Sequence, residues 1–398
     1  MENDFEKLFT RGVAEVIVRE ELLQKLRSGR QLRLKLGFDP SKPDLHVGHA
    51  VVLRKIRRFQ DLGHQVVLIV GDWTAQIGDP SGRDESRHML TPEEVQENAQ
   101  TYMEQFFIIV DQEHTEVRWQ SEWFDRFTLA DVYNLTSRFT LAQMMQHETF
   151  RNRYDEGRPL SLMELLYPVL QAYDSVAVEA DVEFGGTDQK FNILTGRELQ
   201  AALGLSPQDV FLCPLLAGTD GRKMSKSFGN TIDLTMPPEE MYGRLMSIDD
   251  QAMLDYFDLA TEIPERELAA MRQALAAGEA HPMELKKRMG REIVTMFHGE
   301  NAAREAEAEF ERVFQKGQTP SEIPLWAIRE PTPLDRLLRD SNTVPSASQA
   351  RRLILQGAVS IDGDVVTDPK VAIEPRPGKA YLIRVGKRRF LQVTSAQA

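Results

Sequence analysis

The chain has 398 residues, of which 41% are hydrophobic and 27% are charged. This is the composition of an ordinary folded protein that is long enough for two or three domains. The single cysteine, Cys213, excludes an intrachain disulfide, and without a second cysteine or clustered histidines we expect no structural zinc site. No apolar run is long enough to cross a bilayer, and the acidic start MENDFEKLF is unlike a signal peptide. We therefore expect a cytoplasmic protein with no membrane contact.

The charge is unevenly distributed along the chain. The net charge is −13, which argues weakly against a nucleic-acid binder. Residues 331–398, however, hold 11 Lys and Arg against 6 Asp and Glu, whereas the rest holds 37 against 55. A basic C-terminal segment on an acidic body is typical of a local nucleic-acid interface.

The first residues with a chemical signal follow a helical stretch over 1–30. Residues 32–38 alternate apolar and other side chains, which predicts a strand, and residues 39–44 are dense in turn formers. His46 and His49 then open an apolar-periodic helix, with both imidazoles on one face beside free backbone N–H groups. Exposed imidazole donors there predict a phosphate site, and Gly48 would let a flat ring lie against the backbone. The alternative is that His46 only caps the helix and His49 is a packed polar residue.

The next stretch indicates a nucleotide-binding sheet. Residues 65–72, QVVLIVGD, read as a strand that is buried on both faces. Strand, helix and strand in this order form a right-handed βαβ unit, the first half of a doubly wound parallel sheet. Ligands bind at the carboxyl ends of such strands, where both the histidine turn and residues 72–83 lie.

The pattern from Thr91 to about Arg158 is mostly helical. Thr91 and Glu94 predict a capping box at its start. Residues 128–150 are rich in Leu, Phe and Met, which is consistent either with core or with a subunit interface inserted between the halves of the sheet.

The core resumes with a helix that carries a polar stripe. Tyr167, Gln171 and Asp174 share one face of an otherwise apolar helix, where polar groups need partners or a ligand. A hydrogen-bonded core network is the alternative. A strand then leads into residues 185–189, GGTDQ, whose paired glycines permit close approach by a ligand.

Residues 211–218 read as another strand, and it precedes a loop over 219–230. Lys223 and Lys226 lie in this loop among serines and glycines. Mobile cations beside hydroxyl donors suit a polyphosphate. A solvated basic loop is the alternative.

The C-terminal part contains a boundary, a helical segment and a small basic domain. Residues 236–238 mark the boundary, 238–315 read as all-helical, and 318–333 read as a proline-rich linker. Ser346 or Ser348 would cap the next helix, and a hairpin would follow. The exposed Arg351 and Arg352 beside a basic second strand pair, which includes Lys387 and Arg388, suit an RNA backbone.

Taken together, these motifs resemble a known family. HVGH at 46–49 resembles the first signature of the class I aminoacyl-tRNA synthetases, and KMSKS at 223–227 matches their second signature. GFDP, IGDPSGR, the polar stripe and GGTDQ resemble the tyrosyl branch more than the tryptophanyl branch. The resemblance covers residues 30–235 and resumes at 333–395, which is similar to an RNA-binding domain that the bacterial branch shares with a ribosomal protein.

The resemblance implies an architecture. A Rossmann-type α/β catalytic domain would cover 1–235, with a helical dimer-interface insertion at about 111–160. An α-helical anticodon-binding domain would cover 236–320, and a small α+β RNA-binding domain would cover 333–398.

The resemblance also implies a reaction, in which tyrosine attacks ATP to form tyrosyl-adenylate and is then transferred to tRNA(Tyr), with Mg²⁺ alongside. The implied catalytic residues are Ser41, His46, His49, Lys223, Lys226 and Ser227. The implied ATP-binding residues are Gly48, Asp188, Gln189, Met224 and Ser225. The implied tyrosine-binding residues are Gly37, Asp39, Asp79, Tyr167, Gln171, Asp174 and Gly186. The implied tRNA-binding residues are Arg351, Arg352, Lys387 and Arg388.

One position departs from the family pattern. Many relatives place a tyrosine that contacts the substrate phenol where this chain has Lys35, so Asp174 would carry more of the discrimination. The alternatives are a tryptophanyl-tRNA synthetase, a non-catalytic RNA-binding protein on the same scaffold, and a small-molecule nucleotidyltransferase. The basic C-terminal segment and the long helical segment argue against the last of these.

Overall fold

The computed structural model describes residues 2–41, 44–81, 90–315, 323–386 and 389–396, with the side chains of residues 2–4, 227 and 315 left out. The chain divides into two compact units, Met1–Gly299 and Glu300–Ala398. Within the described ranges, no helix is both long and apolar enough to cross a membrane.

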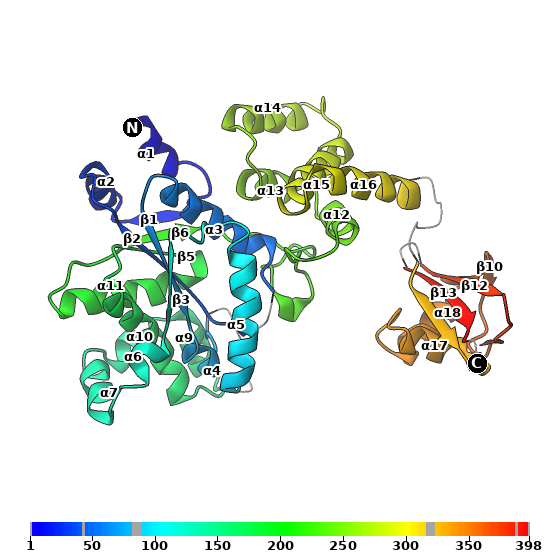
Figure 1. Ribbon diagram of the computed structural model, residues 1–398, viewed down its shortest axis with the longest axis horizontal. Helices are drawn as coiled ribbons and strands as arrows, with labels where there is room; N and C mark the ends of the chain where they lie inside the picture. The colour runs from blue at the N-terminus through cyan, green and yellow to red at the C-terminus, as the bar shows by residue number, and fades with distance from the viewer. Residues whose placement is uncertain (1, 42–43, 82–89, 316–322, 387–388, 397–398) are drawn as a thin grey trace. The chain divides into compact units, whose positions relative to one another are not determined.

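A six-stranded sheet forms the centre of the first unit (Figure 1). Its strands are β1 (Glu15–Ile17), β2 (Arg33–Phe38), β3 (Gln65–Val70), β4 (Thr115–Trp119), β5 (Val182–Gly186) and β6 (Asp209–Cys213). The order is β1-β6-β5-β2-β3-β4, and all neighbours are parallel except β1 and β6. The predicted doubly wound Rossmann-type fold is therefore confirmed. The strand order reverses between β2 and β5, and ligands bind at the carboxyl ends of strands beside such a point.

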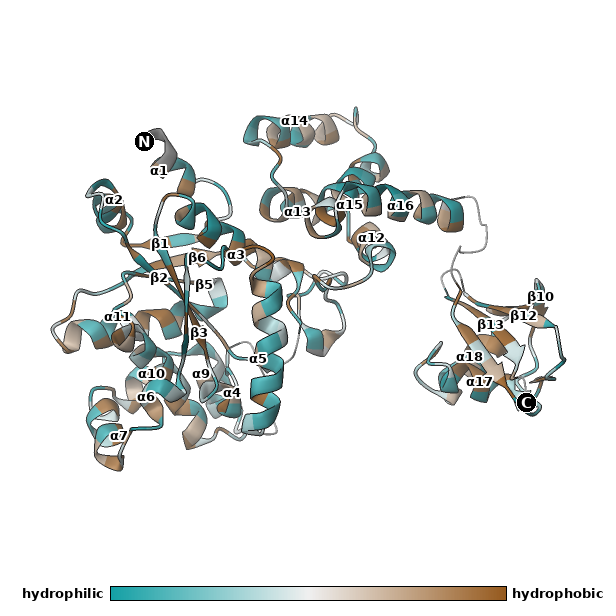
Figure 2. Cartoon of the chain, in the orientation of Figure 1, coloured by the Kyte–Doolittle hydropathy of each residue, from teal (hydrophilic) through white to brown (hydrophobic). Residues whose placement is uncertain are grey.

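Helices pack on the sheet and connect its strands. They are α1 (Glu2–Leu8), α2 (Arg19–Arg27), α3 (Val47–Gln60), α4 (Thr74–Ile77), α5 (Pro92–Phe106), α6 (Ser121–Phe124), α7 (Leu129–Thr136), α8 (Leu141–Met144), α9 (Glu148–Asp155), α10 (Leu162–Ala177), η1 (Thr187–Gln189), α11 (Lys190–Ala202) and η2 (Lys226–Phe228). The centre of the sheet is apolar, and residues Val66–Val70 of β3 are fully buried. The surrounding helix α5 is mostly hydrophilic (Figure 2). Thr91 and Glu94 form the predicted capping box at the start of α5.

Two short strands lie in stretches that were expected to be helical. Residues Glu15–Ile17 pair antiparallel with β6, and Thr115–Trp119 pair parallel with β3 at the other edge of the sheet. The helical prediction for 1–30 is therefore wrong at Glu15–Ile17, and the mostly helical stretch from Thr91 to about Arg158 contains one strand that was not predicted. Both strands depend on partners about 50 or more positions away in the chain, so local periodicity does not indicate them.

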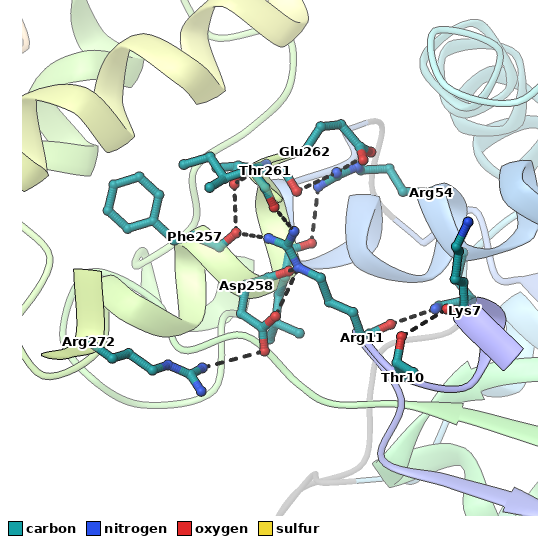
Figure 3. Close-up of polar contacts among 12 residues, drawn as sticks. Lys7, Thr10, Arg11, Arg54, Phe257, Asp258, Thr261, Glu262 and Arg272 are labelled. Atoms are coloured by element: carbon teal, nitrogen blue, oxygen red, sulfur yellow. Dashed lines mark hydrogen bonds and ion pairs between the residues drawn. The ribbon is translucent and has the colours of Figure 1, made fainter. Parts of the chain in front are cut away.

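Four helices follow the sheet within the first unit: α12 (Pro238–Met246), α13 (Met253–Ala260), α14 (Glu265–Ala276) and α15 (Pro282–His298). Two arginines bind the C-terminal end of α13 (Figure 3). Nε of Arg11 donates to the carbonyl oxygen of Asp258 at 2.6 Å and to its carboxylate at 2.9 Å. Arg54, on α3, donates to the carbonyl oxygen of Thr261 at 2.7 Å and pairs with Glu262. The last carbonyls of a helix lack intrahelical partners and attract cations, so this arginine clamp fastens α13 to α3.

The second unit is a small α+β structure. It contains α16 (Glu300–Phe310), η3 (Glu311–Gln315), β7 (Leu325–Ile328), β8 (Thr332–Pro333), α17 (Leu334–Asp340), α18 (Ala347–Leu355), β9 (Val359–Ile361), β10 (Asp364–Val366), β11 (Ala372–Ile373), β12 (Ala380–Val385) and β13 (Arg389–Ser395). A five-stranded sheet in the order β10-β9-β12-β13-β7 packs against α17 and α18, and Ser346 caps α18. The linker prediction is wrong at Leu325–Ile328, because these residues pair parallel with β13.

Candidate active site

A cavity of about 700 Å³ opens at the carboxyl ends of β2 and β5. Predicted site residues from five separate stretches line it: Gly37, Asp39, Ser41, His46, Gly48, His49, Asp79, Tyr167, Gln171, Asp174, Gly186, Asp188, Gln189, Lys223, Met224, Ser225 and Lys226. Ser227 follows in the same loop, but its side chain lies outside the described part of the structure. The fold thus brings both signatures, the polar stripe and the paired glycines to one chamber.

His46 and His49 stand at the N-terminus of α3. Nδ1 of His49 accepts a hydrogen bond from the backbone N–H of His46 at 3.2 Å, and the two rings stack with centroids 3.8 Å apart. The expectation of exposed imidazoles is wrong, since His46 is buried and His49 is half-buried. The cause is a contact with a later segment, because the backbone N–H of Val47 donates to the carbonyl oxygen of Ile232 at 2.9 Å.

Burial also decides the charge of the two histidines. It lowers the pKa of His46 well below its usual value, and burial together with the nearby Lys226 lowers the pKa of His49 to about 4. Both rings are therefore neutral at pH 7 and offer N–H donors rather than positive charge. Nδ1 of His46 is buried and has no hydrogen-bond partner among the described residues. A polar atom of this kind in a cavity wall is available to a ligand.

The positive charge comes instead from the loop after β6. Nζ of Lys223 lies 2.6 Å from the Asp188 carboxylate, and Nζ of Lys226 lies 2.6 Å from the Asp44 carboxylate. Lys226 is the less accessible lysine, with a side chain 16% exposed against 40% for Lys223. Sequence reasoning expected mobile cations, whereas the structure pairs each of them with a carboxylate across the cavity.

One asparagine organises the lysine loop. Asn230 accepts from the backbone N–H of Ser225 at 2.8 Å, and its side-chain amide donates to Asp220 at 2.7 Å and to the carbonyl oxygen of Lys223 at 3.1 Å. A Cβ on Gly218 would lie 2.5 Å from this amide, so that position needs glycine. Asn230 is buried and therefore holds the loop conformation from inside.

Two predicted glycines are closely packed against neighbouring side chains. A Cβ on Gly186 would lie 2.5 Å from Oδ1 of Asp188 and 2.7 Å from Leu215. A Cβ on Gly48 would lie 3.0 Å from Nδ1 of His46. Both positions leave room in the cavity wall that any side chain would fill.

The inner end of the cavity is built from hydrogen-bonded carboxylates. Asp39 accepts from the Tyr167 hydroxyl at 2.9 Å and from Thr74 at 2.7 Å. Asp79 accepts from the side-chain amide of Gln189 at 2.6 Å. Burial, with Asp39 nearby, raises the pKa of Tyr167 well above its usual value, so its hydroxyl stays protonated and donates. These carboxylates form an acidic wall suited to an ammonium group.

Asp174 lies on α10 and lines the cavity as a buried residue. Its two carboxylate oxygens accept from Gln120 Nε2 at 2.8 Å and from Trp123 Nε1 at 3.2 Å. Burial raises its pKa to about 7, although Lys35 lowers it. Each oxygen of an ionised carboxylate can accept a further hydrogen bond. Asp174 can therefore accept the hydroxyl of a ligand that reaches the end of the cavity.

Several residues of the site carry no motif and were missed by sequence reasoning. Gln120 lies in the loop after β4, Asp44 in the turn before α3, and Glu183 on β5, and all three line the cavity. The side-chain oxygen of Gln120 accepts from the backbone N–H of Thr74 at 2.9 Å, so it links the acidic wall to Asp174. The only available signal was that Gln120 directly follows β4 and that Asp44 lies in the turn after β2, whereas Glu183 lies near the start of β5 and carried no such signal.

In the second unit, two of the four predicted RNA-binding residues are described. Arg351 is exposed and pairs with Asp335 at 2.6 Å, and Arg352 is exposed on the same helix. Lys387 and Arg388 lie outside the described residues.

Comparisons with known proteins agree with this arrangement. Residues 27–315 match the family model "tRNA synthetases class I (W and Y)", and residues 332–376 match the S4 domain. A tyrosine–tRNA ligase of Dehalococcoides mccartyi strain CBDB1 is 52% identical over 98% of both chains, and one of Thermotoga maritima is 49% identical over 98% of this chain and 97% of its own.

Solved structures show the same fold at lower identity. The tyrosyl-tRNA synthetase of Archaeoglobus fulgidus, complexed with L-tyrosine, has a TM-score of 0.62 at 22% identity and covers 77% of this chain and all of its own. A C-terminally truncated mitochondrial enzyme of Aspergillus nidulans has a TM-score of 0.63 at 20% identity, over 79% of this chain and 94% of its own. From its signatures, its sheet and its full-length relatives, the chain belongs to the tyrosyl-tRNA synthetases of class I.

Proposed function

We propose that this chain is an active tyrosine–tRNA ligase. The observation that carries the proposal is a single cavity in which both class I signatures meet a buried carboxylate acceptor, Asp174. In the first step, a carboxylate oxygen of tyrosine attacks the α-phosphorus of ATP, and pyrophosphate leaves. In the second step, a ribose hydroxyl of the terminal adenosine of tRNA attacks the adenylate carbonyl, and AMP leaves. Neither step needs a nucleophile from the enzyme, so the residues act by positioning and charge stabilisation.

We assign the ATP phosphates to the outer part of the cavity. The neutral rings of His46 and His49 donate hydrogen bonds from the helix start, together with Ser41. Lys223 and Lys226 exchange their carboxylate partners for the phosphates and stabilise the charge that develops on pyrophosphate, with Ser227 beside them. Gly48, Met224 and Ser225 border the adenosine, and Asp188, once released by Lys223, accepts from the ribose.

We assign tyrosine to the inner part. Asp79, Tyr167 and Gln171 surround its ammonium group, Asp39 and Gln189 orient the reacting carboxylate, and Gly37 and Gly186 leave room for the substrate. Asp174 accepts the phenol hydroxyl. A phenylalanine there would leave this buried acceptor without its partner, which is how a polar pocket rejects an analogue that lacks a hydroxyl.

We propose that Mg²⁺ arrives on the ATP phosphates. Among the described residues there is no group of three or more His, Cys, Asp or Glu side chains that could hold a metal ion. Phosphate oxygens and carboxylates are the ligands that Mg²⁺ prefers, and the carboxylates of Asp44 and Asp188 lie where the phosphates would be. The metal would neutralise phosphate charge during the reaction.

The remaining parts of the chain would bind tRNA. We propose that residues 236–320 contact the anticodon arm and that 333–398 contact the RNA backbone through Arg351, Arg352, Lys387 and Arg388. The excess of basic residues in the C-terminal segment supports the second assignment. Since tRNA charging serves translation, we place the protein in the cytoplasm.

We also propose a homodimer through the insertion at about 111–160. Large apolar side chains that are 63% to 81% exposed gather in and beside it: Leu129, Tyr133, Leu141, Tyr154 and Leu162. Apolar surface of this kind marks an interface. Sedimentation equilibrium should give a dimer that Leu129→Asp with Leu162→Asp dissociates, and a monomeric wild-type protein at micromolar concentration would refute the proposal.

The decisive experiment is exchange between ATP and labelled pyrophosphate with tyrosine, phenylalanine and tryptophan in parallel. Exchange with tyrosine alone supports the proposal. Exchange with tryptophan would reassign the pocket and favour the tryptophanyl alternative. No exchange with any of them would favour a non-catalytic RNA-binding protein.

A further inference from the structure

A fully buried ion pair lies behind the inner end of the cavity. Lys35 on β2 and Glu183 on β5 are direct partners across these parallel strands, and their side chains are 0% and 2% exposed. Nζ of Lys35 lies 3.0 Å from Oε1 of Glu183. Glu183 lines the cavity, whereas Lys35 lies behind the cavity wall and does not line it.

Every donor and acceptor of this pair is used. Nζ of Lys35 also donates to the Ser175 hydroxyl at 2.7 Å and to the carbonyl oxygen of Gln171 at 2.9 Å, so its three protons have three acceptors. Glu183 accepts from Ser175 at 3.1 Å and from Gln208 at 2.5 Å. Burial of an ion pair is tolerated only when the remaining donors and acceptors of both groups are hydrogen-bonded. Lys35 and Glu183 meet this condition.

The pair reaches the pocket through α10. Oε1 of Glu183 accepts from the side-chain amide of Gln171 at 3.1 Å, and Lys35 holds the backbone carbonyl of the same residue. Gln171 is therefore fixed at both its backbone and its side chain. Asp174 lies one residue before Ser175, the residue that links the two charges.

The neighbouring helix leaves room for this network. On α11, a Cβ at Gly196 would lie 2.8 Å from the Gln208 amide and 3.0 Å from the Ser175 hydroxyl. Any side chain at position 196 would displace the Gln208 amide and the Ser175 hydroxyl. The glycine therefore keeps the hydrogen-bonding groups of the network in place.

We propose that Lys35 and Glu183 are positioning residues for tyrosine specificity: together they hold Gln171 and Ser175 of α10 and so place Asp174, the carboxylate that receives the phenol hydroxyl. The proposal rests on the proposed function and deepens it. It also explains why the substitution of Lys35 for the family's tyrosine need not abolish phenol recognition, because the lysine acts through Asp174 instead of contacting the substrate.

The charges around Asp174 make the two members of the pair act in opposite directions. Lys35 from β2 lowers the pKa of Asp174, whereas Glu183 from β5 raises it. Tyr167, on the same helix, is held protonated, and Gln120 and Trp123 from the β4–α6 segment are neutral. Lys35 and Glu183 therefore adjust the ionisation of Asp174, which accepts the phenol hydroxyl.

The test compares Lys35→Met, Glu183→Gln and the double variant by tyrosine-dependent pyrophosphate exchange between pH 5.5 and 9. For Lys35→Met, we expect the pH at which tyrosine KM rises to move up by about one pH unit or more. At neutral pH, its preference for tyrosine over phenylalanine should fall about tenfold for each pH unit of that displacement. Glu183→Gln should move the same transition down, and the double variant should return it close to the wild-type pH.

The controls separate positioning from a general loss of structure. Lys25→Met breaks another ion pair of the sheet, with Asp209, at the amino ends of the strands, and should leave the pH profile and KM for ATP unchanged. The double variant leaves neither charge unpaired, so it keeps the test valid if a single variant fails to fold.

Opposite displacements in the two single variants support the proposal. Displacements in the same direction, or pH profiles identical to that of the wild type with the same tyrosine preference, would overturn it. Failure of the wild-type protein to exchange with tyrosine would instead overturn the proposed function, so the two failures are distinguishable.

Discussion

The Asp174 carboxyl titrates near neutral pH, and this gives tyrosine recognition a pH dependence. Its pKa is about 7 because burial disfavours the charged form. Above that pH the carboxylate accepts the phenol hydroxyl with full charge, and below it the carboxyl is protonated and accepts more weakly. Because the pKa of Asp174 is raised to about 7, the affinity for tyrosine falls as the pH drops below 7.

We accordingly predict that tyrosine KM in the exchange assay rises about tenfold for each pH unit below 7. KM for ATP should stay flat between pH 6 and 8, because the pKa of His49 is about 4 and that of His46 is also far below this range. A tyrosine KM that is constant from pH 5.5 to 8 would contradict the assignment of Asp174.

Lys226 provides a second prediction at the residue scale. Its ammonium lies against Asp44 at the cavity mouth, away from the tyrosine end. Lys226→Ala should lower kcat for adenylate formation by about 10²–10³-fold, the usual loss when a group that stabilises transition-state charge is removed. Tyrosine affinity, measured by equilibrium dialysis, should change little.

Lys286→Ala is the matched control, since Lys286 also pairs with a carboxylate, Asp250, at 2.6 Å but lies outside the cavity. It should have wild-type kinetics. Equal losses of adenylate formation and tyrosine binding in Lys226→Ala would exclude the role proposed for this lysine.

Single residues also show where sequence reasoning stops. The spacing of Tyr167, Gln171 and Asp174 on one helix face is visible in the chain, because it follows from helical periodicity alone. Asp44 and Gln120 become part of the site only through contacts with residues distant in sequence. Neither residue belongs to a sequence motif, so the sequence alone did not identify it as part of the site.

At the scale of elements, the conformation of the lysine loop depends on the buried side chain of Asn230. Asn230→Ala removes the three hydrogen bonds that tie the loop together, to Ser225, Asp220 and the carbonyl oxygen of Lys223. We predict that the loop over 219–230 is cleaved faster in limited proteolysis and that kcat for exchange falls. Tyrosine affinity should be retained.

Asn301→Ala replaces an exposed asparagine on α16 and serves as the control. It should be cleaved at the wild-type rate. An Asn230→Ala protein with wild-type proteolysis and wild-type kcat would show that the loop holds its conformation without this side chain.

The same scale explains which elements were predicted. α3, α5 and α10 have local apolar periodicity and N-terminal caps, and β3 is a continuous aliphatic run, so all four are visible in the chain. β1, β4 and β7 are short edge strands whose pairing partners are far away in sequence. Pairing of this kind is a tertiary property, and local pattern cannot supply it.

At the scale of the whole molecule, the second unit should be separable from adenylate chemistry. Its core is formed from its own residues, which include Leu334, Ile354 and Val393. Because β7 pairs with β13, a truncation at residue 333 would leave β7 without its partner. The cut therefore belongs after Gln315.

We predict that a protein ending at Gln315 exchanges pyrophosphate at the wild-type rate but charges tRNA(Tyr) with a KM for tRNA raised at least about tenfold, from the loss of phosphate contacts. The salt dependence of charging should also become shallower. Unchanged charging would refute the RNA-binding role of residues 333–398, and lost exchange would show that the cut damages the catalytic unit.

The arginine clamp on α13 has a consequence for chimeric enzymes. The carbonyl oxygens at the C-terminal end of α13 accept hydrogen bonds from Arg11, near the start of the chain, and from Arg54, on the helix that begins with the histidine signature. A graft of residues 238–298 from a distant relative would need to place acceptor carbonyl oxygens where these guanidinium groups reach. The helical segment should therefore be transplanted together with residues 1–60, which supply both arginines.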